Sequence, residues 1–246
     1  MKDKKCFIEI QNSIIFYKLA RTKRKTIGIT IDMSGEVKVS APLQMSEEQI
    51  EEVLEKKANW IIKKLSEIQV VNKNLVIKQF IDGEKFLYLG KDYELKVIEQ
   101  NSNKVEAVIQ EDKMMIYLPQ HLQEENKNQI IKEALLKWYR KCFSQIVDER
   151  IKEYSLQLKV TPCKVVIKSQ KTRWGSCSSM GNINLNWRLV MAPIAIIDYI
   201  IVHELCHLKV MNHSKDFWYQ VGLIMPDYKE RREWLKENGY LINAYL

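Results

Sequence analysis

The decisive stretch of the sequence is PIAIIDYIIVHELCH, residues 193–207, in which closely spaced apolar residues lead into two histidines. Pro193 suits the start of a helix, because the amide proton that proline lacks has no partner in the first turn. Residues four apart lie on one helical face, so His203 and His207 can direct their imidazoles to one point. We therefore predict a helix that offers two nitrogen ligands to a metal ion.

A third ligand is needed, because catalytic zinc has three protein ligands and an open position. His213 is the expected one. It lies six residues beyond His207, too far to share the helical face, so the helix must end and the chain must turn back. Asn212 is expected to adopt the left-handed conformation at this turn.

The same segment supplies a candidate general base. Glu204 follows the first histidine and lies near enough to accept a proton from a water on the metal. The pattern therefore predicts metal-assisted hydrolysis, in which zinc polarises a carbonyl and Glu204 transfers the proton to the leaving group. Arg173, Tyr219 and Tyr228 all remain candidates for stabilising the oxyanion. The fourth histidine, His121, is expected at the surface.

Composition is that of a globular protein with a core, since 46% of the 246 residues are hydrophobic and 28% are charged. The five cysteines are scattered and form no C-x-x-C pair, which favours free thiols in a reducing compartment. No apolar run of sufficient length follows the basic first residues, so no signal peptide is expected. The most apolar stretch, 191–202, is short and contains Asp198, so no membrane span is expected either. These features predict a cytoplasmic location.

The net charge of +8 is unevenly distributed. No acidic residue lies between Glu153 and Asp198, while lysines and arginines recur there. Such a stretch is more often a solvated face than a nucleic-acid site. Nucleic acid is therefore a possible partner that the sequence does not require.

The first half of the chain is predicted to be rich in β structure. Alternating polar and apolar residues predict strands at 7–10, 27–31, 36–39 and within 80–118. Ser46 and Gln49 have the spacing of a capping box, and the apolar stripe after them predicts one helix that ends before residue 72. We expect residues 1–120 to form a β-rich region with one helix.

Residues 121–246 are expected to form a second domain, which makes the chain α+β. A long helix is predicted over 124–158, with strands at 165–167 and 182–187 and a turn at Gly175-Ser176. A terminal helix is predicted from Asp227, where Glu230 completes a capping box, to about Gly239.

Five motifs occur together: RWGSC (173–177), GNINLNWRL (181–189), HELCH (203–207), HS (213–214) and FW (217–218). In combination they resemble the YgjP-like family of bacterial zinc metallopeptidases, which is related to the SprT-like and WLM-type proteases. The resemblance covers most of the chain and is most specific over 160–240. Metzincins share the ligand spacing, but their glycine three residues after the second histidine is Val210 here.

The resemblance implies a minimal zincin or gluzincin-like catalytic domain, with the active-site helix packed on a short sheet. It implies zinc as the cofactor, His203, His207 and His213 as its ligands, and Glu204 as the catalytic acid/base. The β-rich region with its helix would precede this domain.

The resemblance also implies a peptide or protein substrate, which in zincin-like folds commonly lies along an edge strand. We expect that edge around 182–187, with Asn184, Asn186, Arg173 and Tyr219 as substrate-binding residues. Two other functions remain open. One is a nucleic-acid-associated protease acting on DNA-bound proteins, and the other is a zinc amidohydrolase with a non-peptide substrate.

Overall fold

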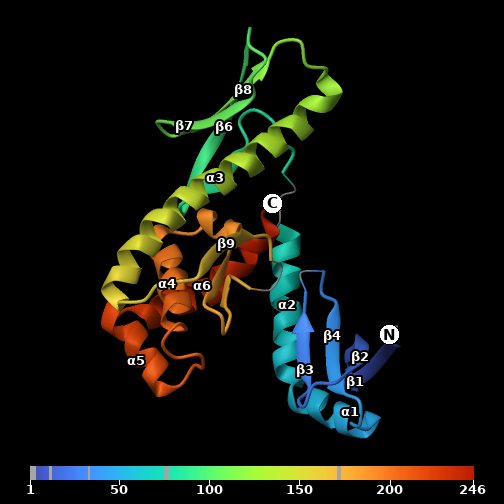
Figure 1. Ribbon diagram of the computed structural model, residues 1–246. Helices are drawn as coiled ribbons and strands as arrows, with labels where there is room; N and C mark the ends of the chain where they lie inside the picture. Colours follow the sequence, from blue (N-terminus) through green and yellow to red (C-terminus); the bar gives the residue numbers. More distant parts are fainter. Residues whose placement is uncertain (1–3, 11–12, 33, 75–77, 171–172) are drawn as a thin grey trace. The chain divides into compact units, whose positions relative to one another are not determined.

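The computed structural model describes residues 4–10, 13–32, 34–74, 78–170 and 173–246 (Figure 1). The chain divides into two compact units, Met1–Val76 and Ile77–Leu246. The expected domain boundary at 120/121 therefore falls inside the second unit. Within the described ranges, no helix is long and apolar enough to cross a membrane.

The first unit is a four-stranded sheet covered by two helices. Its strands have the order β1-β2-β4-β3, where β2 and β4 are parallel and the two outer pairs are antiparallel. The elements are β1 (Lys4–Ile10), β2 (Ser13–Thr22), β3 (Gly28–Ile31), β4 (Val37–Pro42), α1 (Glu47–Lys56) and α2 (Ala58–Asn74). Val39, Leu54 and Ile61 are among the residues that form its core.

The sequence predicted where the helical segment of this unit begins, but not that it consists of two helices. The capping box of Ser46 and Gln49 is present at the N-terminus of α1. However, the single predicted helix is wrong, because the chain breaks at Lys57 and continues as α2 to Asn74. Strand β2, which lies inside the sheet, was not predicted.

The second unit begins with another four-stranded sheet. Its strands are β5 (Lys85–Tyr88), β6 (Lys91–Gln100), β7 (Glu106–Gln110) and β8 (Lys113–Pro119). The order β5-β6-β8-β7 repeats that of the first sheet, with one central parallel pair and two antiparallel outer pairs. Each sheet also ends in a proline, Pro42 or Pro119, before its helix. This repeated strand plan was not predicted from the sequence.

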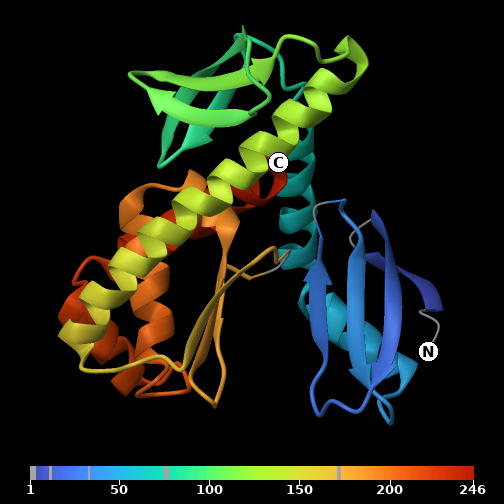
Figure 2. The same ribbon diagram turned by 45° about the horizontal axis from the view of Figure 1, so that its top comes forward.

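Helix α3 (Glu124–Leu158) connects this sheet to the rest of the unit and explains why the chain does not divide at 120. It contacts β7 along one part of its length and η1 and α4 along another (Figure 2). One stripe of the helix is buried at every fourth residue: Ile131, Leu135, Tyr139, Phe143 and Val147. The predicted span of 124–158 is confirmed.

The remainder of the second unit is a three-stranded sheet with short helices beside it. Its elements are β9 (Lys164–Lys168), β10 (Gly175–Cys177), β11 (Asn182–Asn186), the 3-10 helix η1 (Trp187–Met191), α4 (Ile194–Cys206), α5 (Lys215–Ile224) and α6 (Tyr228–Ala244). The strand order is β10-β11-β9, so β11 lies inside the sheet and β10 forms an edge. The predicted turn at Gly175-Ser176 is therefore wrong, and so is the predicted edge at 182–187.

The last helix also differs from its prediction. Asp227 precedes α6 but makes no capping hydrogen bond, and instead pairs with Arg231 at 2.9 Å. The helix continues past Gly239 to Ala244. Gly239 serves packing here, because a Cβ at this position would lie 3.0 Å from Cζ2 of Trp174.

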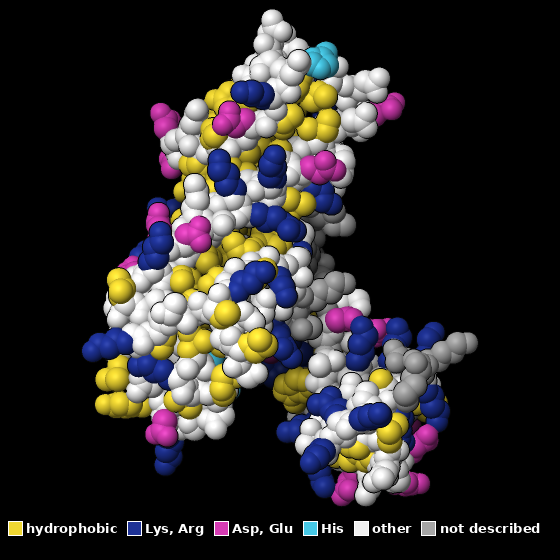
Figure 3. Space-filling model, in the orientation of Figure 1, with side chains coloured by type: hydrophobic (Ala, Val, Ile, Leu, Met, Phe, Trp, Pro, Cys, Tyr) yellow, Lys and Arg dark blue, Asp and Glu magenta, His cyan; other side chains and the backbone are white. Residues whose placement is uncertain are grey.

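Positive charge is spread over the surface. On the face that Figure 3 shows, Lys and Arg side chains are scattered among other residues rather than gathered in one patch. Lys164 and Lys168, from the acid-free stretch, are exposed at the two ends of β9. This distribution is typical of a solvated surface.

We expect Tyr139→Phe to lower the free energy of unfolding by about 1 kcal/mol, because the buried Tyr139 hydroxyl donates a 2.8 Å hydrogen bond to the Leu87 carbonyl. Urea denaturation measures this change. Tyr117→Phe is the matched control, since its exposed hydroxyl only contacts Gln110 at 3.3 Å. Equal stabilities of the two variants would contradict the role assigned to Tyr139.

Candidate metal centre

Helix α4 is held in place at its N-terminal end by the turn between β5 and β6. The amide of Leu89 donates to the Val190 carbonyl at 2.9 Å, and that of Gly90 donates to the Met191 carbonyl at 3.0 Å. Gly90 has a φ of 80°, and a Cβ there would lie 2.9 Å from Cγ of Pro193. Only glycine allows this close approach, which fixes where α4 begins.

The three predicted histidines come together at the other end of α4. His203 lies in its last turn, His207 follows the helix directly, and His213 immediately precedes the segment that leads into α5. One ring nitrogen from each lies within 4.8 Å of the other two. The Nε2 atoms of His203 and His213 are 3.1 Å apart. Two nitrogens bound at the zinc distance in tetrahedral geometry are about 3.3 Å apart, so this spacing suits zinc.

Hydrogen bonding and burial prepare the imidazoles for a metal ion. Nδ1 of His207 lies 3.1 Å from the Val210 carbonyl, an interaction that leaves Nε2 free for a metal. Burial lowers the pKa of His203 to about 3, helped by the neighbouring histidines, and burial also lowers the pKa of His207. Metal ligation requires neutral imidazole, so these environments favour the binding form.

The turn that returns His213 to the helix is built differently from the prediction. Asn212 is not among the residues with a positive φ, so the predicted left-handed conformation is wrong. Its side-chain Oδ1 instead accepts a hydrogen bond from the Ser214 amide at 3.2 Å. This local bond replaces a backbone turn, which is a common use of asparagine in loops.

The carboxyl of Glu204 lies against the adjacent sheet. It is buried against Gly175 of β10, where an added Cβ would lie only 2.5 Å from its Oε1. Its Oε2 atom is buried and has no hydrogen-bond partner. Burial raises the pKa of Glu204 to about 8, and the positive charge of Arg173 acts in the opposite direction. A buried, unpaired carboxyl beside a ligand cluster is typical of a functional group.

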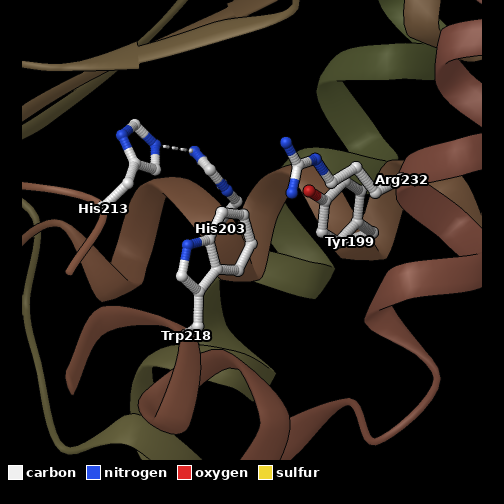
Figure 4. A pocket seen from close by; sticks show the side chains of 5 residues that line it. All are labelled: Tyr199, His203, His213, Trp218 and Arg232. Carbon is white, nitrogen blue, oxygen red and sulfur yellow. Dashed lines mark hydrogen bonds between the residues drawn. The ribbon is translucent and has the colours of Figure 1, made fainter. Parts of the chain in front are cut away.

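A cavity of about 400 Å³ opens beside two of the histidines (Figure 4). It is lined by Tyr199, His203, His213, Trp218 and Arg232. The sequence analysis missed Tyr199 and Arg232 as site residues. The position of Tyr199, four residues before His203 on the same helix, was a usable signal, whereas Arg232 reaches the site only through the packing of α6.

The predicted substrate-binding residues lie in different environments. Arg173 is exposed and acts electrostatically on Glu204. Asn184 is half-buried on β11 and donates to Oγ of Ser176 at 3.2 Å. Tyr219 is 65% exposed on α5 and does not line the cavity.

Asn186 is not available to a substrate. Its side chain is fully buried, and Nδ2 donates to the carbonyls of Gln170 at 2.8 Å and Arg173 at 3.1 Å. Oδ1 accepts from the Arg188 amide at 3.3 Å. Asn186 therefore fixes the segment that precedes β10, a structural role that alternation along the strand did not reveal.

We expect His213→Ala to weaken zinc binding by more than roughly 100-fold, since even residues that only support a metal ligand cost 10- to 100-fold when changed. Competition with a chromophoric chelator measures the affinity. His121→Ala, which removes an exposed histidine far along the chain, should bind zinc like the unchanged protein. Equal affinities of the two variants would exclude His213 as a ligand.

Two solved structures are similar to parts of the chain. The crystal structure of the metallopeptidase zymogen of Pyrococcus abyssi abylysin has 28% identity and a TM-score of 0.34, and the match covers 37% of this chain and 93% of that chain. The crystal structure of the metallopeptidase zymogen of Methanocaldococcus jannaschii jannalysin has 23% identity and a TM-score of 0.33, with 35% and 90% covered. No curated protein matches the chain.

The family comparison covers much more of the sequence. The family described as YgjP-like, metallopeptidase domain, matches residues 25–238, which include parts of both units and every residue of the candidate metal centre. This agrees with the resemblance of the five sequence motifs. The chain therefore belongs to the YgjP-like metallopeptidase family.

Proposed function

We propose that the protein hydrolyses peptide bonds with a zinc ion held by His203, His207 and His213 and with Glu204 as general base. One observation carries the proposal: three imidazole nitrogens converge within 4.8 Å beside a buried carboxyl that has an unpaired oxygen. All three donors are imidazoles, which suit zinc, and a zinc ion held by them would have a further position for water or substrate.

Bound zinc would supply Lewis acidity and lower the pKa of a coordinated water. Glu204 would accept a proton from the attacking water and deliver it to the leaving amine. The unpaired Oε2 leaves the carboxyl free for this transfer. A cation nearby favours the ionised carboxylate and opposes the effect of burial on its pKa, so Glu204 can act as a base.

The edge strand β10 is the best-placed element for a peptide substrate. Its outer edge has no strand partner among the described residues, and α4 packs beside it. Gly175 on this strand contacts the carboxyl of Glu204. A peptide that pairs with β10 would therefore bring its backbone carbonyls to the general base. Arg173, just before the strand, would lie near the same bond.

We expect Glu204→Gln to bind about one zinc ion per chain and to lose proteolytic activity, because the amide retains the shape of the side chain but cannot accept the proton. Bound metal is measured by mass spectrometry, and cleavage is followed in a peptide library derived from a proteome. Removing zinc with a chelator should abolish cleavage by the unchanged protein, and adding zinc should restore it. Equal cleavage by Glu204→Gln would overturn the proposed mechanism.

We expect Gly175→Ala to lower kcat/KM by about 10- to 100-fold with zinc still bound, because the new methyl group displaces the catalytic carboxyl. Gly222→Ala in α5 is the control: its Cβ would meet Tyr228 at 3.6 Å, an ordinary contact. Both variants are tested for thermal stability and metal content. If Gly175→Ala is as active as Gly222→Ala, the close contact with Glu204 has no catalytic importance.

A further inference from the structure

Two polar side chains in the cavity have no part in metal binding. Tyr199 comes from α4 and Arg232 from α6, and Figure 4 shows the tyrosine hydroxyl and the guanidinium on the same side of His203. Within the described part of the chain, neither group has a hydrogen-bond or ion-pair partner. Polar groups beside a reactive centre that the protein leaves unpaired are available to a ligand.

The neighbouring arginine shows that this availability is specific. Arg231 is fully engaged in the structure: it pairs with Asp227 at 2.9 Å and donates to the Ala195 carbonyl at 2.9 Å. Arg232 is exposed, and its guanidinium carbon lies 5.0 Å from the centroid of the Trp218 ring. Arg231 therefore connects α6 to α4, whereas the N–H donors of Arg232 have no hydrogen-bond partner among the described residues.

Trp218 holds the free guanidinium in position. Its ring stacks on Tyr228 with 5.2 Å between centroids and 15° between planes, so it is a firm support. An arginine lying on such a ring keeps its planar set of N–H donors pointing outward. Trp218 also lies 5.8 Å from the His203 ring and 5.7 Å from the His213 ring, which places the supported guanidinium at the edge of the metal centre.

The tyrosine is suited to act as a second donor. Tyr199 is buried, and its ring centroid lies 5.9 Å from that of His203. A phenolic hydroxyl can donate one hydrogen bond. The cavity lining contains no acidic residue that would compete for these donors.

We propose that Arg232 and Tyr199 form a subsite for a carboxylate group of the substrate, next to the bond that is cleaved. This inference rests on the proposed peptidase function. A planar guanidinium binds a carboxylate through two parallel hydrogen bonds, and a hydroxyl adds a third donor. The carboxylate is either an acidic side chain near the scissile bond or the free C-terminus of the peptide.

Matched peptides test the subsite and distinguish the two sources. In one series of peptides, glutamate is placed in turn at each of the two positions before and the two positions after the cleaved bond. In a second series, glutamine takes the place of each glutamate. A third pair has a free or an amidated C-terminus at the same distance. The zinc-loaded full chain should cleave the carboxylate-bearing member of one such pair with a kcat/KM roughly 10- to 100-fold higher than that of its neutral partner. A difference of this size is the effect of one charge-assisted bidentate contact.

Variants assign the preference to Arg232. Arg232→Gln should cleave acidic and neutral peptides at similar rates, and Arg232→Lys should retain part of the preference, because lysine keeps the charge without the planar donors. Arg140→Gln is the matched control: Arg140 is also exposed and lies 5.4 Å from a tryptophan ring, that of Trp187. No preference in the unchanged protein, or an unaltered preference in Arg232→Gln, would overturn the proposal.

A binding measurement separates this proposal from the proposed function. Zinc-loaded Glu204→Gln is titrated by calorimetry with the same peptide pairs, with and without the additional Arg232→Gln change. Tighter binding of the carboxylate peptide that depends on Arg232, without cleavage by the unchanged protein, would support the subsite and reject the peptidase function. Cleavage without any carboxylate preference would support the peptidase function and reject the subsite.

Discussion

Neighbouring residues in an α-helix point roughly 100° apart, and the last turn of α4 uses this angle to serve two surfaces. His203 faces His213 and the cavity, whereas Glu204 faces Gly175 in the adjacent sheet. A rotation of α4 about its axis would move both side chains together. The helix must therefore be held in one position and in one orientation about its axis. The backbone hydrogen bonds at its start and the apolar packing along its length meet this requirement. The positions of β10, α5 and α6 all follow from it.

The buried carboxyls of α4 show two different treatments of the same chemical group. Asp198 is nearly buried, but Arg150 of α3 lies 3.2 Å away and compensates its charge. Glu204, six residues later, has no ion-pair partner among the described residues, although burial raises the pKa of both groups. Leaving a buried carboxyl unpaired costs stability, and the fold accepts this cost at only one of the two positions. The contrast favours a chemical rather than a structural role for Glu204.

The sequence predicted the parts of the structure that depend on local spacing. The helical pair His203 and His207, the span of α3 and the capping box at Ser46 are all encoded within a few turns of chain. His213 was also found, because histidine is rare in this chain. The mechanism assigned to these residues stays a proposal, and so does the identity of the metal.

Features that depend on distant contacts were not predictable in the same way. Gly175 and Ser176 have the composition of a turn, yet pairing with β11 makes them an edge strand. Asn186 alternates correctly for a substrate-facing residue, but buried carbonyls of the preceding loop take its donors. The expected domain boundary at 120/121 does not coincide with the boundary between the two compact units, because α3 packs against both the β5–β8 sheet and α4.

The close fit of Trp174 against Gly239 has a mechanical consequence. Trp174 directly precedes Gly175, and Gly239 lies on α6 two turns after Arg232. Because even a methyl group on Gly239 would lie 3.0 Å from Cζ2 of Trp174, a shift of α6 along its axis would press on the indole, which adjoins β10. A ligand that binds Arg232 and shifts α6 would therefore also act on β10, the strand that contacts Glu204. Close packing thus links α6, which carries Arg232, to the strand that contacts Glu204.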